Sequence, residues 1–220
     1  MEKRLIITPK QAIQLYEMAY PASFNFNEFE SIRSFVERVR YCRQRLKKIG
    51  VGSSRIVFAV DDEKALKIAK NNKGVAQNNY ELESALNGYN ISPKVFRYDR
   101  DGKWIEVQIA RKVKQGDFQR LLGCNFQTVV NIFYQIDKEM NPSRYRYNQN
   151  QVFADKETMH KAWENDELYP FLVYISDYQP PVADLCRLAN WGVVNDNGKE
   201  RLVIVDAGLS EEIWNEYYSR

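Results

Sequence analysis

The stretch "ADLCRLANWGVVNDNGKERLVIVDAGL", residues 183–209, places three oxygen-bearing side chains around a β-hairpin pattern. Its two apolar runs flank Asn197-Gly198, a strong signal for a two-residue hairpin turn. A hairpin folded about this turn brings Asn190, before the first strand, beside Asp206, after the second. An amide oxygen and a carboxylate are hard ligands that suit Mg²⁺ bound together with phosphates. We therefore predict a metal site here, with the alternative that Asn and Asp occupy strand ends only because they favour turns.

Asp184 precedes Asn190 by six residues and could reach the same space, where its carboxylate would act as a general base for a hydroxyl. Cys186 lies between them and could be a nucleophile only with a basic partner. The single histidine of the chain, His160, is far away in sequence, so we interpret Cys186 as a small buried residue.

The composition is that of a globular protein, with 44% hydrophobic and 28% charged residues in a chain of 220. Its 32 basic and 29 acidic residues give a net charge of +3. This balance of charges is too even to indicate nucleic-acid binding by itself. Three widely spaced cysteines and one histidine disfavour disulfides and zinc and favour the cytosol. No apolar run is long enough for a signal peptide or a membrane span. We expect a cytoplasmic protein without a membrane partner.

Residues 1–46 have helical patterns. One helix is expected to start at Thr8-Pro9. A second should begin at Asn27, where Glu30 completes a capping-box pattern, and run through Cys42 with apolar residues at helical spacing. Its basic end, "RVRYCRQRLKK", could meet the phosphates of a nucleic acid, although a solvated helix face is the favoured interpretation.

Residues 47–114 change to strand patterns with one interposed helix. "GVGSSRIVFAV", the turn "DDEK" and "ALKIAK" form a predicted hairpin, and "PKVFRYDRDGKWIEVQIARKV" forms a second, turned at Asp101-Gly102. Between them "NNKGVAQNNYELESALNG" is expected to be a helix. Its expected buried side consists of Val75, Leu82, Ala85 and Leu86.

The glycine-rich turn between these strands is a candidate phosphate site. Gly50 and Gly52 would let the backbone approach an anion closely, and Ser53 and Ser54 follow them. A glycine-serine turn in a surface hairpin would have the same sequence, so this segment alone leaves both interpretations open.

Lys67 lies in the next strand, where alternation places it on one face between two alanines. These small neighbours leave room for a phosphate at the amine and for a flat ring over Ala65. The alternative, equally open on this segment, is a solvent-facing lysine on an edge strand. In the following helix Glu81 shares a side with Gln77 and Asn78 and could hold the lysine, or could be an ordinary exposed glutamate.

Residues 115–220 are expected to form a reduced, mainly helical unit that carries the hairpin. "FQRLLGCNFQTVVNIFYQIDKEM" fits one buried helix, and "SEEIWNEYYSR" fits a short closing helix capped by Ser210. The segment from Asn141 to Asn165 is polar, and we expect a long loop with at most one helical turn. Loops of that length are usually either functional or mobile.

Taken together, these segments resemble the protein-kinase-like fold. Within it, the sequence is most similar to small kinase-like proteins encoded by bacteriophage genomes. "GVGSSR" is similar to the glycine-rich loop of that family, "KALK" to the strand with the phosphate-contacting lysine, and "DLCRLAN" with "VDAG" to its catalytic loop and metal-binding turn. The resemblance covers roughly Lys48 to Lys112 and Ala183 to Leu209. It implies an α+β, two-lobed fold that binds ATP and Mg²⁺ between the lobes, in a phage host cytoplasm or a virion.

The resemblance implies a nucleotide site in residues 47–114. Lys67 would contact the α- and β-phosphates, Glu81 would hold it, and Ala65 would touch the adenine. The "EVQIARK" region would supply the hinge. The loop over the nucleotide would consist of Gly50, Gly52, Ser53 and Ser54.

The resemblance likewise implies that Asn190 and Asp206 bind Mg²⁺ and that Asp184 is the catalytic base. The sequence departs from the family here. Neither histidine nor arginine precedes Asp184, the spacing to Asn190 is one residue longer than usual, and Cys186 stands where a lysine is expected. Arg187 could replace that lysine. Either the loop bulges or Asp184 is not the base.

The last part of the chain departs further. Ala207-Gly208 follows Asp206, so the usual phenylalanine is missing, and the 14 residues after Asp206 leave no room for an activation segment. Three hypotheses follow. The first is a phosphotransferase with an unknown protein or small-molecule acceptor. The second is a pseudokinase that binds nucleotide or has a structural role, for example in a phage particle, and the weakest is a nucleic-acid-binding protein.

Overall fold

The structure, a computed structural model, describes residues 20–83, 88–146, 150–206 and 210–217. The chain forms two compact units. Unit 1 contains Met1–Val75 and Phe96–Ile109, and unit 2 contains Ala76–Val95 and Ala110–Arg220. The helix expected at Thr8-Pro9 lies outside the described residues, and the boundaries expected after residues 46 and 114 stay a prediction.

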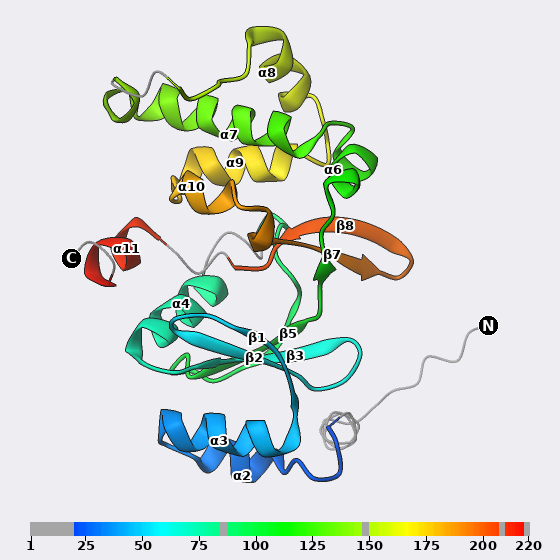
Figure 1. Cartoon of the computed structure of the whole chain (residues 1–220), viewed down its shortest axis with the longest axis vertical. Coiled ribbons are helices and arrows are strands. Elements are labelled where there is room, and N and C mark those ends of the chain that lie inside the picture. The colour runs from blue at the N-terminus through cyan, green and yellow to red at the C-terminus, as the bar shows by residue number, and fades with distance from the viewer. Residues whose placement is uncertain (1–19, 84–87, 147–149, 207–209, 218–220) are drawn as a thin grey trace. The chain divides into compact units, whose positions relative to one another are not determined.

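Unit 1 is built on a five-stranded sheet in the order β1-β2-β3-β5-β4 (Figure 1). The strands are β1 (Lys47–Val51), β2 (Arg55–Ala59), β3 (Lys64–Ala69), β4 (Val95–Tyr98) and β5 (Trp104–Gln108). Both predicted hairpins are confirmed, and Gly102 has the left-handed φ of 71° that suits glycine in a turn. β3 pairs antiparallel with β2 on one side and β5 on the other, so it is a central strand.

Two short helices precede the sheet, α2 (Phe26–Ser31) and α3 (Phe35–Arg45). The single helix predicted from Asn27 through Cys42 is wrong, because the backbone becomes extended at Ile32 and Ser34 caps a new helix. The first helix is capped by Asn25 and not by Asn27. An uninterrupted run of apolar residues at helical spacing conceals such a break.

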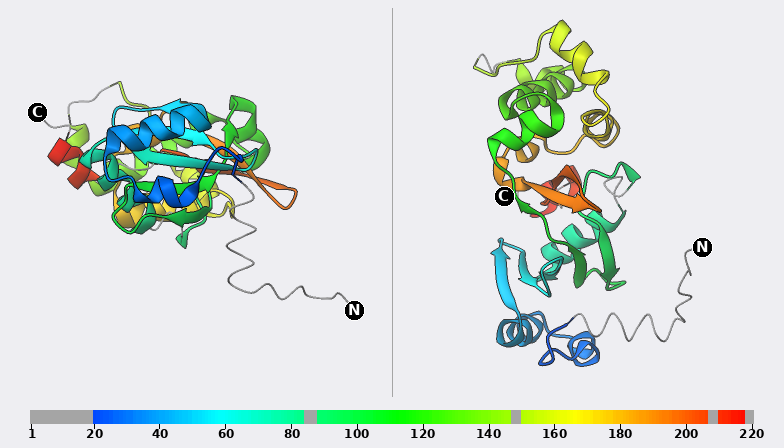
Figure 2. Two further views of the ribbon diagram at one scale, coloured as in Figure 1. Left: turned by 90° about the horizontal axis from the view of Figure 1, so that it is seen from below. Right: turned by 90° about the vertical axis from the view of Figure 1, so that its right-hand side faces the viewer.

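The core of unit 1 lies between these two helices and one face of the sheet (Figure 1, Figure 2). Leu66 and Ile68 of β3 point into it, as the alternation in the sequence predicts. The other buried side chains of this core include Phe24, Phe26, Phe29, Val39, Tyr41, Cys42, Ile56, Phe58 and Trp104. Each large apolar side chain that is fully buried contributes roughly 1.5–3 kcal/mol, so this cluster holds α2 and α3 on the sheet.

Helix α4 (Asn72–Glu83) follows β3, as predicted. Its buried side differs from the expected one, because Val75 and Leu82 are only half-buried. Ala85 and Leu86 lie outside the described residues. The residues of α4 that are buried instead are polar, and they are Gln77, Asn78 and Glu81.

The first turn of α4 packs closely on the end of β3 and on the β1–β2 turn. A Cβ added at Gly74 would lie 2.4 Å from the Ser54 carbonyl oxygen and 3.0 Å from the Ala69 Cα. Both neighbours are backbone atoms, so neither can move aside easily. Glycine at this position sets how closely the first turn of α4 approaches the end of β3.

Unit 2 is mainly helical. Its helices are α6 (Gln115–Leu122), α7 (Phe126–Met140), α8 (Lys156–Trp163), α9 (Tyr169–Tyr178), α10 (Val182–Leu185) and α11 (Glu211–Tyr217), with 3-10 turns η1 (Pro142–Tyr145) and η2 (Leu188–Asn190). α7 packs alongside α9 (Figure 1). The closing helix is confirmed, and the Ile213 amide donates a 3.1 Å hydrogen bond to the Ser210 hydroxyl as predicted.

Two predictions for unit 2 are wrong. The segment predicted as one buried helix forms α6 and α7, because Gly123, with a φ of 73°, ends the first and Asn125 caps the second. The region from Asn141 to Asn165 holds the eight-residue helix α8 in addition to η1. Asp155 caps α8 by accepting a hydrogen bond from the Thr158 amide.

The predicted hairpin is confirmed as β7 (Trp191–Asp196) and β8 (Lys199–Ile204). Asn197 and Gly198 have φ angles of 55° and 92°, and two successive left-handed residues are typical of a type I′ turn. β6 (Arg111–Lys112) adds a third strand beside β7. This approach depends on Gly192, because a Cβ there would lie 2.6 Å from the Ala110 Cβ.

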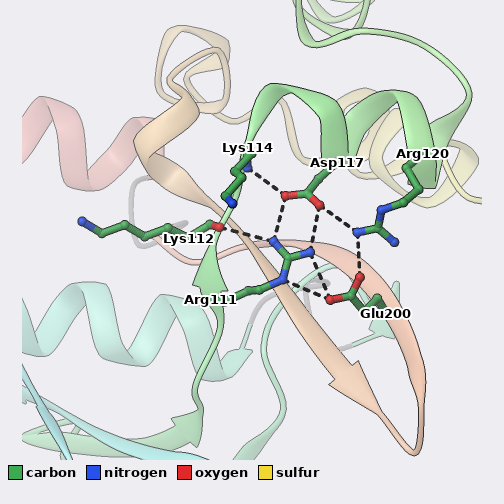
Figure 3. Close-up of polar contacts among 6 residues, drawn as sticks. All are labelled: Arg111, Lys112, Lys114, Asp117, Arg120 and Glu200. Atoms are coloured by element: carbon green, nitrogen blue, oxygen red, sulfur yellow. Dashed lines mark hydrogen bonds and ion pairs between the residues drawn. The ribbon is translucent and has the colours of Figure 1, made fainter.

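A cluster of ion pairs joins α6 to β6 and β8 (Figure 3). Asp117 accepts two hydrogen bonds of 2.8 Å from Arg111, one of 2.7 Å from Arg120 and one of 2.8 Å from the Lys114 amide. Glu200 of β8 contacts both arginines, at 3.0 and 2.6 Å. The hydrogen bonds from Arg111 hold the pKa of Asp117 well below its usual range.

The expected α+β fold is confirmed. The order of elements, hairpin, helix, hairpin, helical unit and final hairpin, is the order that the resemblance to the protein-kinase-like fold implies. Within the described ranges, no helix combines the length and the apolar character needed to cross a bilayer.

Gly74→Ala should lower the free energy of unfolding by about 1–3 kcal/mol, because the new methyl group meets backbone atoms. The matched control is Gly116→Ala in α6, where an added Cβ has nothing within 4 Å. That change should leave stability the same or raise it by up to about 1 kcal/mol. Urea denaturation of both variants tests the packing, and equal effects would contradict it.

Asp117→Asn should lower the free energy of unfolding by about 1–3 kcal/mol at pH 7, because Asn cannot accept every hydrogen bond that the carboxylate accepts. A carboxyl whose pKa is lowered by folding stabilises the protein above its unfolded pKa of about 4 and loses that contribution as the pH falls. The difference from wild type should therefore shrink below about pH 4.

The control for this change is Asp101→Asn, at a largely exposed carboxylate that forms an ion pair with Lys103. It should change stability by less than about 0.5 kcal/mol. A loss at Asp117 no larger than the loss at Asp101 would contradict the role given to the cluster.

Candidate functional site

Asp184 and Asn190 lie side by side in unit 2. The Asn190 Nδ2 donates a 2.9 Å hydrogen bond to the Asp184 carbonyl oxygen. α10 and η2 take up the residues between them as two short helical turns, so the longer spacing does not separate the two. Because the amide nitrogen is engaged, the Oδ1 of Asn190 is the atom that a cation would use.

Trp191 fixes this loop to the core of unit 2. Its Nε1 donates a 2.6 Å hydrogen bond to the Leu185 carbonyl, and its ring is 2% exposed. It packs against Phe118, Phe133 and Phe171, with ring centroids 5.0–6.1 Å apart. The sequence prediction did not include this anchor, although an aromatic residue that starts a buried strand directly after Asn190 was the available signal.

Asp206 lies at the mouth of the hairpin beside Asn190. The Val205 amide donates a 2.8 Å hydrogen bond to the Asn190 carbonyl, which extends the β7–β8 ladder to this point. Burial raises the pKa of Asp184, the cation of Arg187 lowers it, and the negative charge of Asp206 raises it further. The two carboxylates are therefore close enough to repel each other.

These residues form a donor set that suits Mg²⁺. Asp184 Oδ2 is buried and, in the part of the chain that the structure describes, has no hydrogen-bond partner. An unpartnered carboxylate oxygen, a second carboxylate and an amide oxygen are hard ligands for a small divalent cation. Across the described ranges no group of three or more His, Cys, Asp and Glu could hold a metal. Mg²⁺ needs no such group, because it takes one or two carboxylates together with phosphate oxygens and water.

Arg187 and Cys186 lie next to the predicted base. The Arg187 Nη1 is 3.4 Å from the Asp184 Oδ1, and the arginine side chain is largely exposed. Cys186 packs against the core of unit 2, and burial raises the pKa of its thiol to about 12. A thiol with that pKa stays protonated at neutral pH, and the residue is half-buried rather than fully buried as expected.

A cavity of about 460 Å³ lies beside Asp184 in unit 2, with Asp137 of α7 on its wall. Asp137 accepts hydrogen bonds from Asn141 Nδ2 at 3.0 Å, from Arg144 Nη1 at 2.9 Å and from the Tyr145 hydroxyl. These bonds tie η1 to α7. The sequence prediction did not include Asp137. The available signal was its position one helical turn after Phe133, as an acidic residue on an otherwise apolar helix face.

The predicted phosphate loop is the turn between β1 and β2 in unit 1. The Gly52 amide donates a 2.9 Å hydrogen bond to the Arg55 carbonyl, while Ser53 is exposed and Ser54 is buried. A Cβ at Gly50 or Gly52 would make only ordinary van der Waals contacts. The local packing of the described residues therefore does not require glycine at either position, which keeps a role in ligand binding open.

Lys67 lies in the middle of the sheet, paired with Val57 of β2 and Ile105 of β5. It is 7% exposed, and its face also carries Ala65, which is 2% exposed. The alternative of a solvent-facing lysine on an edge strand is therefore wrong. A charged amine on a central strand is costly to bury unless it is paired.

Glu81 is buried on the face of α4 that also carries Gln77 and Asn78. This confirms that the three share one side of the helix and excludes an ordinary exposed glutamate. The buried side of α4 at these positions is therefore polar, and such groups are costly to bury unless they are hydrogen-bonded.

The structure distinguishes two carboxylates on the same cavity wall. Asp137→Asn should lower the free energy of unfolding by about 1–3 kcal/mol, because a fully partnered acceptor is lost. Asp184→Asn should change it by less than about 1 kcal/mol, because only the weak contact to Arg187 is lost and a buried charge is removed. Denaturation in buffer without divalent cations measures both, and a larger loss at Asp184 would contradict this distinction.

No protein-family model and no curated protein matches the chain. Two similar solved structures are a choline/ethanolamine kinase family protein from Mesorhizobium loti and APH(2″)-IIa in a ternary complex with streptomycin and ATP. The first is 16% identical over 79% of this chain and 65% of its own, with a TM-score of 0.31. The second is 12% identical over 81% and 71%, with a TM-score of 0.32. The chain thus spans about two thirds of the length of these structures, and the likeness is weak.

Proposed function

We propose that this protein is an ATP- and Mg²⁺-dependent phosphotransferase that acts on a hydroxyl group. The observation that carries the proposal is the convergence of Asp184, Asn190 and Asp206 in unit 2, where one hydrogen bond joins the loop to the hairpin and a second extends the hairpin ladder. Two mutually repelling carboxylates, of which Asp184 has a buried oxygen with no partner in the described ranges, do not stabilise a fold. They suit a bound cation and a reacting hydroxyl.

Asn190 Oδ1 and a carboxylate oxygen of Asp206 would hold Mg²⁺, which when bound neutralises charge on the transferred phosphate. The two ligands come from the ends of paired strands. The register of the hairpin therefore fixes their separation, and the Asn197-Gly198 turn fixes the register.

Asp184 is the proposed general base. The acceptor hydroxyl gives its proton to the Asp184 carboxylate while its oxygen forms a bond to the γ-phosphorus of ATP. The bond from that phosphorus to the β–γ bridging oxygen breaks, and ADP leaves with the electron pair. Arg187, next to Asp184, would contact the transferred phosphate.

The nucleotide would be bound largely by unit 1. Lys67 would contact the α- and β-phosphates and be held by Glu81, and Ala65 would touch the adenine. The burial of Lys67 on a central strand and of Glu81 on a polar helix face supports these roles. The loop over the phosphates would consist of Gly50, Gly52, Ser53 and Ser54.

A pseudokinase is the second candidate, and one observation favours it. The Asp184 Oδ1 lies 3.4 Å from the Arg187 Nη1, and a carboxylate paired with a cation is a weaker base. Such a protein would bind nucleotide without turnover, or serve as an interaction module, for example in a phage particle.

Lys67→Ala and Asp206→Ala should each lower the rate of phosphate transfer by about a hundredfold or more. Lys67 would neutralise the phosphates directly, and Asp206 would hold the Mg²⁺ that neutralises them. The measurement follows labelled ATP with Mg²⁺, with transfer onto the protein itself and onto a mixture of peptide and small-molecule hydroxyl acceptors.

The matched controls are Lys199→Ala and Asp101→Ala, at side chains that are 76% and 71% exposed. Both should react at the wild-type rate. Wild-type rates for Lys67→Ala or Asp206→Ala would contradict the assignment. ATP binding by calorimetry without any transfer would support the pseudokinase, and neither binding nor transfer would reject both candidates.

A further inference from the structure

The cavity beside Asp184 has the size of a small-molecule site. Its volume of about 460 Å³ lies within the range of roughly 300–1,000 Å³ that is usual for small ligands. All of its lining residues belong to unit 2. One of them is the proposed base, so a molecule in this cavity would have a group next to the reacting carboxylate.

Aromatic and apolar side chains form much of the wall. Tyr134 and Tyr145 line it with their rings edge to face, 6.2 Å apart at 79°, and Pro181 and Val182 add apolar surface. Phe153 packs edge-on against Tyr145 at 5.6 Å and, with the hydrogen bond to Asp137, fixes that ring. Such a wall binds a flat or apolar body better than an extended polar chain.

The charges of the lining cancel. Asp137 is paired with Arg144 at 2.9 Å, and Asp184 lies 3.4 Å from Arg187, so two carboxylates face two guanidinium groups. A ligand with a net charge would have to compete with one partner of an ion pair for the other partner. An uncharged ligand enters without that cost.

Asp184 provides the polar contact for such a ligand. Its Oδ2 has no hydrogen-bond donor among the described residues, and rotation about the terminal torsion of the side chain exchanges the two oxygens. A ligand hydroxyl that donates to this carboxylate would satisfy it, and the same hydroxyl would be the one that reacts.

We infer that the cavity binds an uncharged small molecule in which a hydroxyl is attached to an aromatic ring or a similarly flat apolar body, and that this molecule is the phosphate acceptor. The acceptor role rests on the proposed phosphotransfer, whereas the binding does not. Peptides and charged small molecules are the alternatives that the experiment separates.

The test compares benzyl alcohol, benzylamine and benzoate, which share one ring and differ in charge. Saturation-transfer NMR on the full chain, without nucleotide, measures the binding of each. Benzyl alcohol should bind about fivefold more tightly than either charged analogue, because no ion pair of the wall is broken. Equal or tighter binding of benzylamine or benzoate would overturn the inference.

Variants then locate the site. Ala183→Phe fills the cavity from an exposed position and should weaken the binding of benzyl alcohol by about tenfold. Tyr145→Ala should weaken it by roughly threefold to tenfold through the lost ring contact. The control, Tyr98→Ala, changes an exposed tyrosine of β4 and should have no effect. Unchanged binding in Ala183→Phe would overturn the inference even if Tyr145→Ala does not fold.

Adding ATP and Mg²⁺ distinguishes the two proposals. Binding of benzyl alcohol that Ala183→Phe weakens, with no ATP binding, would overturn the phosphotransfer and leave the ligand class standing. Transfer of phosphate to peptides alone, with no binding of benzyl alcohol, would overturn the ligand class and leave the phosphotransfer standing. Transfer to benzyl alcohol in the wild type, reduced in Ala183→Phe, would support both.

Discussion

The candidate site depends on one hydrogen bond, from the Asn190 Nδ2 to the Asp184 carbonyl oxygen. It closes the loop after α10 onto the start of β7, and the ladder bond from the Val205 amide to the Asn190 carbonyl brings the end of β8 to the same point. The acceptor of the first bond and both partners of the second are backbone atoms, so the positions of the three oxygen-bearing residues follow from the path of the chain. Trp191, buried directly after Asn190, ties that path to the hydrophobic core of unit 2.

Carboxylates elsewhere in unit 2 differ from Asp184 in the number of hydrogen bonds that they accept. Asp117 and Asp137 each accept several hydrogen bonds, and each joins elements of the fold. Asp184 is half-buried, its buried Oδ2 has no hydrogen-bond partner among the described residues, and a second carboxylate lies near it. A fold gains nothing from such a group, and buried unsatisfied atoms are rare in native proteins. This is the physical reason for assigning function to Asp184 and structure to the other two.

The sequence predicted the parts of the fold that local chemistry determines. Asn197-Gly198 and Asp101-Gly102 specify tight turns, so both hairpins followed from them. The helix breaks at Ser34 and Gly123 were not predicted, because the apolar spacing continues across them and a single cap is a weaker signal. Lys67 was ambiguous, since only the pairing of β3 on both sides shows that it is buried. The cavity could not be predicted, because α7, η1 and α10 meet only through tertiary packing.

The most direct test of the central claim is a crystal structure of the full chain with a non-hydrolysable ATP analogue and Mg²⁺. The claim is that the hairpin mouth binds the metal and that Asp184 faces the reacting phosphate. We expect Mg²⁺ bound by Asn190 Oδ1 and Asp206, and an Asp184 oxygen close enough to accept a proton from a hydroxyl placed about 3–3.5 Å from the γ-phosphorus. A nucleotide bound elsewhere, or a metal that contacts neither Asn190 nor Asp206, would contradict it.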